Sequence, residues 1–498
     1  MTAVTTAVRT VNVAGDLAVL ATRNGWVDRT AFLADDRAWT HGAVHDLAAR
    51  AASVLAEHGV RPGDRVLLAL PDGIGWVTTF LAVARLGAVA VLTNPELTAA
   101  DHSLLAEDSA ARLCVTGGAL RGRFDRWLDV ADLLARAATA GPAEVHGVDP
   151  HAPLYIQYTS GTTGEPKGAV HTHQDLPTYF DAVGGPVLGI GPADVTLSVS
   201  KLFFAYGFGN AFVFPLYSGS AAVLVAERPP AERIAELVAR HRVTMLYAVP
   251  SAYAALVARA DRAAFGSLRG AVSAGETLPP ALGERVTDLL GVPVYEQIGS
   301  TEAGHAFCAN GVFGNVPGTM GWPVPGYELE LRGRDGRPVP DGAEGELWVR
   351  GPTVLREYLN RPEQTARVLV DGWLATRDLA SRRSDGTYRH HGRADDLEMV
   401  GGITVSPVEI ERLFEDHPRV GEVAVAAVRD DTGATKLRAF VVPSGPSADA
   451  ERLEQELLGL AREHLAAFKV PRTVRIVPAL PRTATGKLRR HIVRTGSW

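Results

Sequence analysis

The sequence predicts a large N-terminal domain of layered α/β subdomains with a small β-rich part, followed by a smaller α+β domain. Three observations lead to this fold class. The chain has 498 residues, more than one compact core usually holds. Up to about residue 325, short apolar runs alternate with helical patterns, as in parallel sheets covered by helices. Beyond that point the pattern changes to short alternating strands, and beyond residue 395 it changes again.

The first predicted elements are a helix, a strand, a second helix and a second strand. Apolar residues from Val44 to Leu55 follow helical spacing, and Gly59 stands where a helix is expected to end. The apolar run "RVLLAL" (65–70) then predicts a strand. A helical pattern around Phe80 follows, and "AVAVLT" (88–93) predicts the next strand.

The same alternation returns in the middle of the chain. Helices are predicted near 231–240, after Pro250 and from Pro279, and strands over 243–248, 268–275 and 292–299. Ligands of parallel sheets bind at the carboxyl ends of the strands. We therefore expect "AGET" (274–277) and "IGSTE" (298–302) to lie at a binding site.

The last third of the sequence predicts smaller units. "YELELRG", "GELWVRG" and "YRHHGR" alternate between turns of Gly, Pro and Asp, which is typical of small antiparallel sheets. After Asp395, helices are predicted near 407–416 and 449–466, and strands over 422–428, 437–442 and 473–477. The predicted domains are therefore residues 1–394 and 395–498.

Composition excludes several classes of protein. The formal net charge of −6 and the pI near 6.2 give no electrostatic basis for binding nucleic acid. Only Cys114 and Cys308 are present, which excludes a disulfide scaffold and fits a reducing compartment. The N-terminal residues do not follow the order of a signal peptide, and no apolar run reaches membrane-spanning length. We predict a cytoplasmic protein without a membrane partner.

One segment, "YTSGTTGEPKGAVHTH" (158–173), combines hydroxyl side chains and glycines around Lys167. It does not have the spacing of the P-loop NTPases, because Pro166 stands where their second glycine is required. Its composition nevertheless suits phosphate oxygens, which accept from backbone N–H groups and hydroxyls. A solvated turn is the alternative interpretation of such a segment.

Three further motifs accompany this segment: "IGSTEAGH" (298–305), "GWLATRDLASRRSDGTYRHHGRADD" (372–396) and "PRTATGKLRR" (481–490). In this order the four motifs resemble the adenylate-forming superfamily of acyl-CoA synthetases, aryl acid ligases and peptide-synthetase adenylation domains, over nearly the whole chain. The nearest resemblance is to benzoate-CoA ligases. It rests on residues 198–216 and 271–279, and on His305 and Phe307.

The resemblance implies an ATP- and Mg²⁺-dependent enzyme with a mobile C-terminal domain. It would adenylate an aryl or arylpropenoic acid and transfer it to CoA or to the phosphopantetheine of a carrier protein. The catalytic residues that it implies are Lys487, Thr301 and Glu302, of which Glu302 would hold the metal. Asp395 would be the hinge between the domains.

The resemblance also assigns the binding residues. Those expected to bind ATP are Thr159, Ser160, Gly161, Thr162, Thr163, Gly164, Lys167, Gly275, Glu276, Thr277, Gln297, Asp378 and Arg393. Those expected to bind the acid are Ala205, Tyr206, Gly207, Gly299, Ser300, His305 and Ala306. Those expected to act at the acceptor stage are Met399, Gly401 and Gly402.

The sequence departs from these relatives at several positions. Ala303, Gly304 and Ala306 are smaller than the Met, Leu and Ile of benzoate ligases, which predicts room for an acid larger than benzoate. Arg377 replaces the glycine of the usual Thr-Gly-Asp, and we have no reason for it from the sequence. Met399 stands where relatives with "LKVSG" have a lysine, so the sequence leaves open how the second half-reaction proceeds.

Two other functions stay open at this level. An adenylate-forming enzyme can use a non-thiol acceptor or another oxyacid, for example nitrite toward an aryl amine. The chain can also be a non-catalytic binding module of the same fold. Lys487, Glu302 and the hydroxyl-rich loop argue against a module, because binding alone does not require all three.

Overall fold

The computed structural model describes most of the chain, and the described residues are 10–34, 37–160, 166–394, 398–400, 403–429, 435–445, 449–482, 488–496 and 498. The chain forms two compact units. Unit 1 consists of residues up to Ala274 with Val286–Leu329 and Val349–Ala375. Unit 2 consists of Gly275–Arg285, Glu330–Trp348 and Thr376–Trp498.

The larger sheet of unit 1 has nine strands, and its central strands are parallel. In spatial order they are β15 (Trp322–Pro323), β14 (Ala306–Ala309), β13 (Val294–Gly299), β12 (Gly270–Ser273), β11 (Met245–Ala248), β9 (Val195–Ser198), β10 (Ala221–Val223), β1 (Thr30–Ala34) and β2 (Arg37–Thr40). The strands predicted at 243–248, 268–275 and 292–299 are thus confirmed as parallel neighbours.

The second sheet of unit 1 has seven strands. In spatial order they are β18 (Glu357–Tyr358), β8 (Pro166–Thr172), β7 (Pro153–Ser160), β4 (Val89–Thr93), β3 (Arg65–Ala69), β5 (Leu113–Thr116) and β6 (Trp127–Asp129). The predicted strands at 65–70 and 88–93 are β3 and β4, and they are parallel. By contrast, β7 and β8 form an antiparallel hairpin. The glycine-rich segment therefore joins two strands, whereas the loop of P-loop NTPases leads from a strand into a helix.

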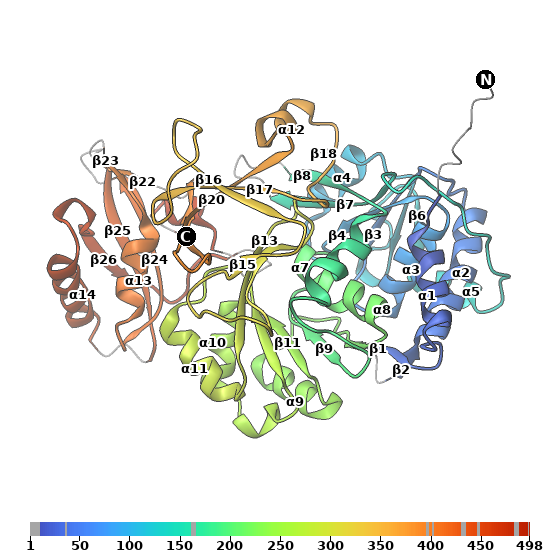
Figure 1. The fold of residues 1–498 in the computed structure, drawn as a ribbon, viewed down its shortest axis with the longest axis horizontal. Coiled ribbons are helices and arrows are strands. Elements are labelled where there is room, and N and C mark those ends of the chain that lie inside the picture. The colour runs from blue at the N-terminus through green and yellow to red at the C-terminus, as the bar shows by residue number, and fades with distance from the viewer. Residues whose placement is uncertain are drawn as a thin grey trace. The chain divides into compact units, whose positions relative to one another are not determined.

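Helices pack beside these sheets, as predicted, and Figure 1 shows α1, α2, α3 and α5 gathered next to β3 and β4. Side chains at the helix starts bind free backbone N–H groups: Thr40 caps α2, and Thr98 and Asp101 form a capping box on α4. The helices are α1 (Val13–Arg23), α2 (His41–Glu57), α3 (Ile74–Arg85), α4 (Ala99–Asp108), α5 (Val130–Ala137), α6 (Asp175–Tyr179), α7 (Ala205–Phe208), α8 (Phe214–Ser218), α9 (Ala231–His241), α10 (Pro250–Arg259), α11 (Pro280–Leu290) and α12 (Pro362–Val368). None of the helices within the described ranges is both long and apolar enough to cross a membrane.

A cluster of aromatic rings supports α7. Trp76 and Phe80 of α3 stack with centroids 5.4 Å apart, and Phe208 and Phe212 stack at 5.2 Å. The rings of Phe80 and Phe212 meet edge to face at 5.0 Å. Together these rings hold α7 and the π-helical turn Gly209–Val213 against α3. The aromatic segment 198–216 is therefore mainly helical after β9, although its apolar composition alone favours a core strand.

Unit 2 contains the predicted small α+β fold. Helices α13 (Pro407–Glu415) and α14 (Ala450–His464) bury Phe414 and Leu457 in one core with the sheet of β24 (Val420–Arg429), β25 (Thr435–Pro443) and β26 (Thr473–Ile476). The remaining elements are β22 (Glu398–Val400), β23 (Ile403–Val405) and α15 (Arg490–Val493).

A five-stranded sheet precedes this fold. Its strands are β16 (Glu328–Arg332), β17 (Glu344–Arg350), β19 (Leu369–Val370), β20 (Trp373–Arg382) and β21 (Tyr388–Arg393). Its pairs β19–β20 and β20–β21 are antiparallel, as the alternating sequence predicts. The boundaries between the two units fall inside β16, β17 and β20. The division at residues 394 and 395 stays a prediction.

Candidate active site

The β7–β8 hairpin presents the predicted phosphate loop. Thr159 faces Lys167 across the hairpin, and Ser160 faces Pro166. The ammonium of Lys167 lies 5.6 Å from the centroid of the Tyr358 ring, on the neighbouring strand β18. The expected ATP-binding residues Gly161, Thr162, Thr163 and Gly164 lie outside the described residues, as does the side chain of Ser160. Their role stays a prediction.

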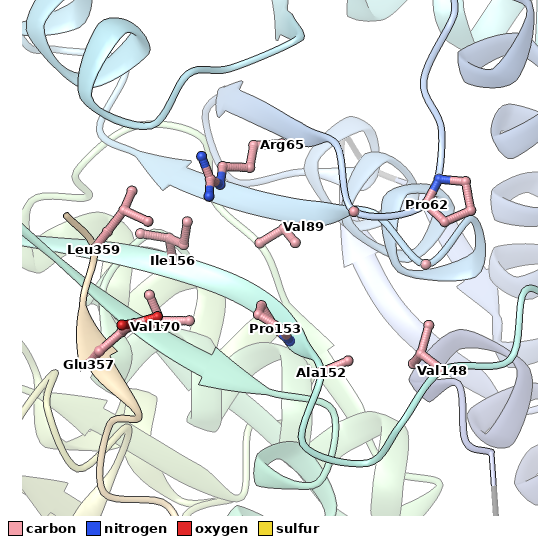
Figure 2. A pocket seen from close by; sticks show the side chains of 12 residues that line it. Pro62, Arg65, Val89, Val148, Ala152, Pro153, Ile156, Val170, Glu357 and Leu359 are labelled. Atoms are coloured by element: carbon pink, nitrogen blue, oxygen red, sulfur yellow. The ribbon is translucent and has the colours of Figure 1, made fainter. Parts of the chain in front are cut away.

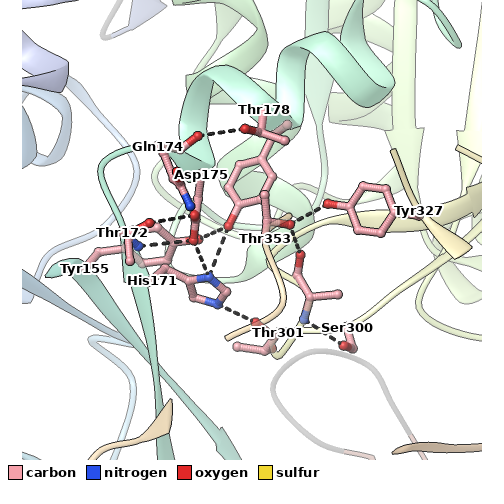
Figure 3. Close-up of polar contacts among 12 residues, drawn as sticks. Tyr155, His171, Thr172, Gln174, Asp175, Thr178, Ser300, Thr301, Tyr327 and Thr353 are labelled. Atoms are coloured by element: carbon pink, nitrogen blue, oxygen red, sulfur yellow. Dashed lines mark hydrogen bonds and ion pairs between the residues drawn. The ribbon is translucent and has the colours of Figure 1, made fainter. Parts of the chain in front are cut away.

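The second predicted motif forms a loop after β13, which we call the acidic loop (Ser300–Gly304). Three of its carbonyl oxygens accept hydrogen bonds from elsewhere in unit 1, and Figure 3 shows the bond from His171 to Thr301. The donors are His171 Nε2 to Thr301 (2.8 Å), the Leu355 N–H to Glu302 (2.6 Å) and Thr353 Oγ1 to Ala303 (2.7 Å). Within the loop, Ser300 Oγ accepts from the N–H of Ala303 at 3.1 Å. The backbone that carries Thr301 and Glu302 is therefore held at several points.

The carboxylate of Glu302 has a side-chain partner of its own. The hydroxyl of Tyr358 donates to Glu302 Oε1 at 2.8 Å. Tyr358 pairs with Ala169 of β8, so the strand beside the phosphate-loop hairpin also orients this carboxylate. A carboxylate held through one oxygen can offer the other oxygen to a hard cation.

The residues assigned to the acid lie in α7 and in the segment from the end of β13 to the start of β14. Tyr206 of α7 donates its hydroxyl to the carbonyl of Val272 in β12, at 3.0 Å. Gly299 ends β13 and pairs with Ala306 at the start of β14. The structure thus brings α7 to the edge of the sheet where a ligand of a parallel sheet is expected.

His305 is buried close to α7. Its Nε2 lies 3.3 Å from Asn210 Oδ1, and its ring meets Phe214 edge to face at 5.0 Å. Burial lowers the pKa of His305 to about 3, so the ring is neutral. Its Nδ1 is buried without a hydrogen-bond partner among the described residues. Glycine is required at Gly209, because a Cβ there would lie 2.1 Å from the His305 ring.

Gly304 does not enlarge an acid pocket, so the expectation from its small size is wrong at this position. Gly304 has a φ of +75°, and a Cβ there would lie 1.8 Å from the hydroxyl oxygen of Tyr179. The space of a larger side chain is already filled by the Tyr179 ring. The glycine therefore reflects a tight contact and a left-handed backbone.

In unit 2, the predicted ATP-binding residues Thr277, Asp378 and Arg393 form a connected set, in which the resemblance gives Asp378 the ribose hydroxyls. The carboxylate of Asp378 lies 3.3 Å from His390 Nε2 and 3.6 Å from Arg393, and His390 Nδ1 lies 2.9 Å from Thr277 Oγ1. Burial raises the pKa of Asp378, but the His390 hydrogen bond and the charges of His390 and Arg393 lower it more. The pKa of Asp378 is thus below its ordinary value, and the carboxylate can accept from two ribose hydroxyls.

Arg377 interrupts the usual Thr-Gly-Asp order at a position that favours glycine. Its φ is +66°, in the left-handed region. A non-glycine residue there costs roughly 1–2 kcal/mol. The arginine lies 3.6 Å from Glu346, and its side chain is half exposed, so this surface ion pair offsets little of the strain.

Arg482 precedes the segment that contains Lys487. It pairs with Leu488 in an isolated antiparallel bridge, and its guanidinium lies 3.4 Å from Glu276. Lys487 itself lies outside the described residues. Its catalytic role stays a prediction.

The structure describes some of the remaining predicted residues. Gln297 is buried in β13 and donates to the carbonyl of Asn310 at 3.4 Å, while Gly275 directly precedes Glu276. The backbone of Met399 pairs with Thr404 between β22 and β23. The remaining predicted residues, Asp395, Gly401 and Gly402, lie outside the described part of the chain.

Sequence reasoning missed three residues that contact the predicted site: His171, Tyr358 and His390. His171 lies within the quoted glycine-rich motif and His390 within "YRHHGR", but neither motif indicates a partner. Nothing in the sequence around Tyr358 indicates its contact with Glu302, because the two residues are distant in sequence.

A cavity of about 260 Å³ lies elsewhere in unit 1 (Figure 2). Arg65, Val89 and Pro153, the first residues of β3, β4 and β7, line it. The phosphate loop follows the last residue of β7, so the cavity is at the opposite end of the parallel strands. It is therefore separate from the candidate active site.

Comparisons with known proteins identify the family. The family described as "AMP-binding enzyme" matches residues 20–359, and the one described as "AMP-binding enzyme C-terminal domain" matches residues 409–487. The chain therefore belongs to the AMP-binding enzymes. The predicted resemblance and the predicted fold class are both confirmed.

Three of the similar proteins in this family are named as ligases of aryl acids. The chain is 42% identical over 490 residues to the p-hydroxybenzoic acid–AMP ligase FadD22 of Mycobacterium marinum, covering 98% of this chain and 69% of that protein. It is 37% identical to the benzoate–CoA ligase of Thauera aromatica, covering 97% and 96%. The crystal structure of a benzoate CoA ligase from Burkholderia xenovorans superposes with a TM-score of 0.91 at 36% identity, covering 97% and 100%.

Proposed function

We propose that this protein is an ATP-dependent ligase that adenylates a hydroxybenzoate-type aryl acid and transfers the acyl group to a thiol. One observation carries the proposal. The hairpin that bears Lys167 and the loop that bears Glu302 are joined through Tyr358 and His171, so the two groups suited to phosphates and a cation belong to one connected site.

The first half-reaction joins the acid to AMP. A carboxylate oxygen attacks the α-phosphorus of ATP, the bond to the bridging oxygen breaks, and pyrophosphate leaves. Negative charge develops on oxygens that positioned donors and cations stabilise. In this proposal Lys167 and the glycine-rich loop bind pyrophosphate, Thr301 holds a phosphate oxygen, and Lys487 bridges the carboxylate and the α-phosphate.

The second half-reaction releases AMP. The thiol sulfur attacks the acyl carbon, the thiol proton is lost, and the C–O bond to AMP breaks. Free CoA and the phosphopantetheine arm of a carrier protein offer the same thiol. Met399 stands where CoA-using relatives have a lysine, and one relative is named an acid–AMP ligase rather than a CoA ligase. We therefore favour the carrier-bound thiol.

The names of the relatives and one buried atom support a phenolic acid. Two similar proteins are named for p-hydroxybenzoic acid or 4-hydroxybenzoate. His305 Nδ1 has no partner among the described residues, at a position that the resemblance assigns to the acid, and it is an acceptor when Nε2 donates to Asn210 Oδ1. A phenol hydroxyl is a suitable donor for it.

Glu302 fits a Mg²⁺ ion that is bound mainly by the nucleotide. In the described part of the chain, no three His, Cys, Asp or Glu residues gather in a way that could hold a metal. Mg²⁺ in nucleotide sites is commonly held by one or two carboxylates, phosphates and water. Glu302, oriented by Tyr358, would supply that carboxylate. The ion would neutralise charge on the phosphates.

Removing the hydroxyl of Tyr358 tests this assignment with little change in shape. Tyr358→Phe is expected to raise the Mg²⁺ concentration that gives half-maximal pyrophosphate release by roughly 10-fold, as for other residues that orient a metal ligand. Binding of Mn²⁺ with ATP, followed by electron paramagnetic resonance, should weaken in parallel. Tyr158→Phe is the matched control, because that hydroxyl binds Asp108 instead. Equal metal dependence in both variants would contradict the assignment.

A panel of aryl acids tests the proposed function, with and without CoA. We expect pyrophosphate release that depends on a hydroxybenzoate, with slow formation of acyl-CoA. A cation near the acceptor is commonly worth roughly 10²-fold in rate, so Met399→Lys should raise CoA turnover. Absence of pyrophosphate release with every acid would overturn the substrate class. Rapid acyl-CoA formation by the unchanged protein would show that another residue does the work of the missing lysine.

A further inference from the structure

A chain of buried polar side chains connects β7, β8 and α6 to the acidic loop (Figure 3). The hydroxyls of Tyr155 and Tyr179 lie 2.7 Å apart, and the Tyr179 hydroxyl lies 3.3 Å from His171 Nδ1. The ring of Tyr155 stacks on that of His171, with centroids 4.9 Å apart and planes 16° apart. His171 is therefore fixed by stacking as well as by hydrogen bonds.

The orientation of His171 follows from its two nearest polar neighbours. The carbonyl of Thr301 lies 2.8 Å from Nε2, and a carbonyl can only accept, so Nε2 carries a proton. The carboxylate of Asp175 lies 2.9 Å from Nδ1. A carboxylate oxygen that already accepts from Thr172 also accepts here, so Nδ1 carries a proton as well, and the two contacts together fix the orientation of the ring.

Asp175 is itself held firmly. It is buried at the first residue of α6 and accepts from the N–H of Thr172 at 3.1 Å and from Thr172 Oγ1 at 2.7 Å. Thr172 is the last residue of β8. The carboxylate thus ties the start of α6 to the same strand that carries His171 and Lys167.

The bond from His171 to Thr301 spans 130 positions of sequence and joins the two halves of the candidate site. One half is the hairpin that flanks the phosphate loop. The other is the acidic loop, where the predicted phosphate and metal ligands are adjacent residues. Without His171, the partly buried carbonyl of Thr301 would lose this donor, and the loop would relax toward another partner.

We propose that His171, held by Asp175, is a positioning residue for adenylation. It fixes the backbone at Thr301 and so sets the direction in which Thr301 and Glu302 meet the ATP phosphates. This inference rests on the proposed function of the site. Displacements of about 1 Å at such a site can cost roughly 10²-fold in rate.

The test compares His171→Leu with His171→Gln. Leucine removes the donor, whereas the glutamine amide can reach the Thr301 carbonyl and donate to it. We expect His171→Leu to lower kcat for pyrophosphate release by about 10²-fold, with the KM for the acid little changed. The Tm should fall, because the buried Asp175 carboxylate loses a partner. His171→Gln should recover most of the loss of kcat.

His173→Leu is the matched control. His173 is a buried histidine two positions along the chain, and its Nδ1 accepts from the N–H of Val13, not from the acidic loop. A general effect of losing a buried histidine would appear in this control too. Equal losses of kcat in His171→Leu and His173→Leu, or no recovery in His171→Gln, would overturn the proposal.

Binding of a non-hydrolysable ATP analogue with Mg²⁺ separates this proposal from the substrate assignment. His171→Leu is expected to weaken that binding by roughly 10-fold, even if no acid in the panel is a substrate. Unchanged binding and unchanged kcat would contradict the inference, whereas absent turnover by the unchanged protein would contradict only the acid. If His171→Leu does not fold, Asp175→Asn tests the positioning role instead. This variant keeps the histidine but should lower kcat at a similar Tm.

Discussion

Lys487→Ala is expected to lower the rate of adenylate formation by about 10³-fold, because it removes a charge aimed at the developing transition state. The same variant should use a supplied acyl adenylate nearly as well as the unchanged protein, since the second half-reaction does not form the bond to the α-phosphate. Pyrophosphate release measures the first step, and AMP release from synthetic acyl adenylate and a thiol measures the second.

Lys469→Ala is the control for this experiment. Lys469 is a lysine of the same unit that pairs with Glu409 on the surface, and both half-reactions should survive its loss. Equal losses in the two half-reactions of Lys487→Ala would contradict the separation of roles. Unchanged adenylation would remove Lys487 from the mechanism.

Glu302→Gln is expected to lower adenylation by about 10²–10³-fold and to weaken its dependence on Mg²⁺. Glutamine keeps the shape and can still accept from Tyr358, but it loses the charge that holds a cation. The effect should exceed that of Tyr358→Phe, which leaves the carboxylate in place. Metal titrations of pyrophosphate release, together with Mn²⁺ binding in the presence of ATP, provide the measurement.

Glu357→Gln is the matched control for Glu302→Gln. Glu357 precedes Tyr358 on β18, and its side chain lines the cavity at the other end of the strands. Its loss should leave the metal dependence unchanged. If Glu302→Gln retains the metal dependence of the unchanged protein, the cation is bound elsewhere.

Local patterns were enough to predict the alternation of helices and strands. The run around Leu67 predicts β3, and the helical spacing before Gly59 predicts α2, because burial on one or both faces leaves a mark in the sequence. The small α+β fold was predicted for the same reason. Its helices have one apolar side, which carries Phe414 and Leu457.

Contacts between distant segments could not be predicted in this way. Pairing of β7 with β8 turns the glycine-rich segment into a hairpin, and the aromatic residues around Phe208 become helical because they pack on α3. The partners of His171, Tyr358 and His390 depend on this tertiary packing. No periodicity in the sequence records such partners.

Gly304 and Arg377 show the same limit of prediction from sequence. From the sequence, Gly304 suggests space for a ligand, whereas its neighbour in the fold is the Tyr179 hydroxyl. Arg377 gives no sign of its left-handed backbone. In both cases the residue type is known from the sequence, but the atoms that surround it are known only from the fold.

The transfer of an oxygen atom tests the central claim most directly. The protein is incubated with ATP, Mg²⁺ and 4-hydroxybenzoate labelled with ¹⁸O in its carboxylate, with hydroxylamine as the trapping nucleophile. If a carboxylate oxygen attacks the α-phosphorus, that oxygen joins the acyl group to AMP and stays with AMP when hydroxylamine takes the acyl group. Mass spectrometry should then find one ¹⁸O in AMP and none in pyrophosphate. The trapped acyl product keeps the other ¹⁸O. Label in pyrophosphate, or unlabelled AMP formed in step with the trapped acyl product, would contradict adenylation of the acid.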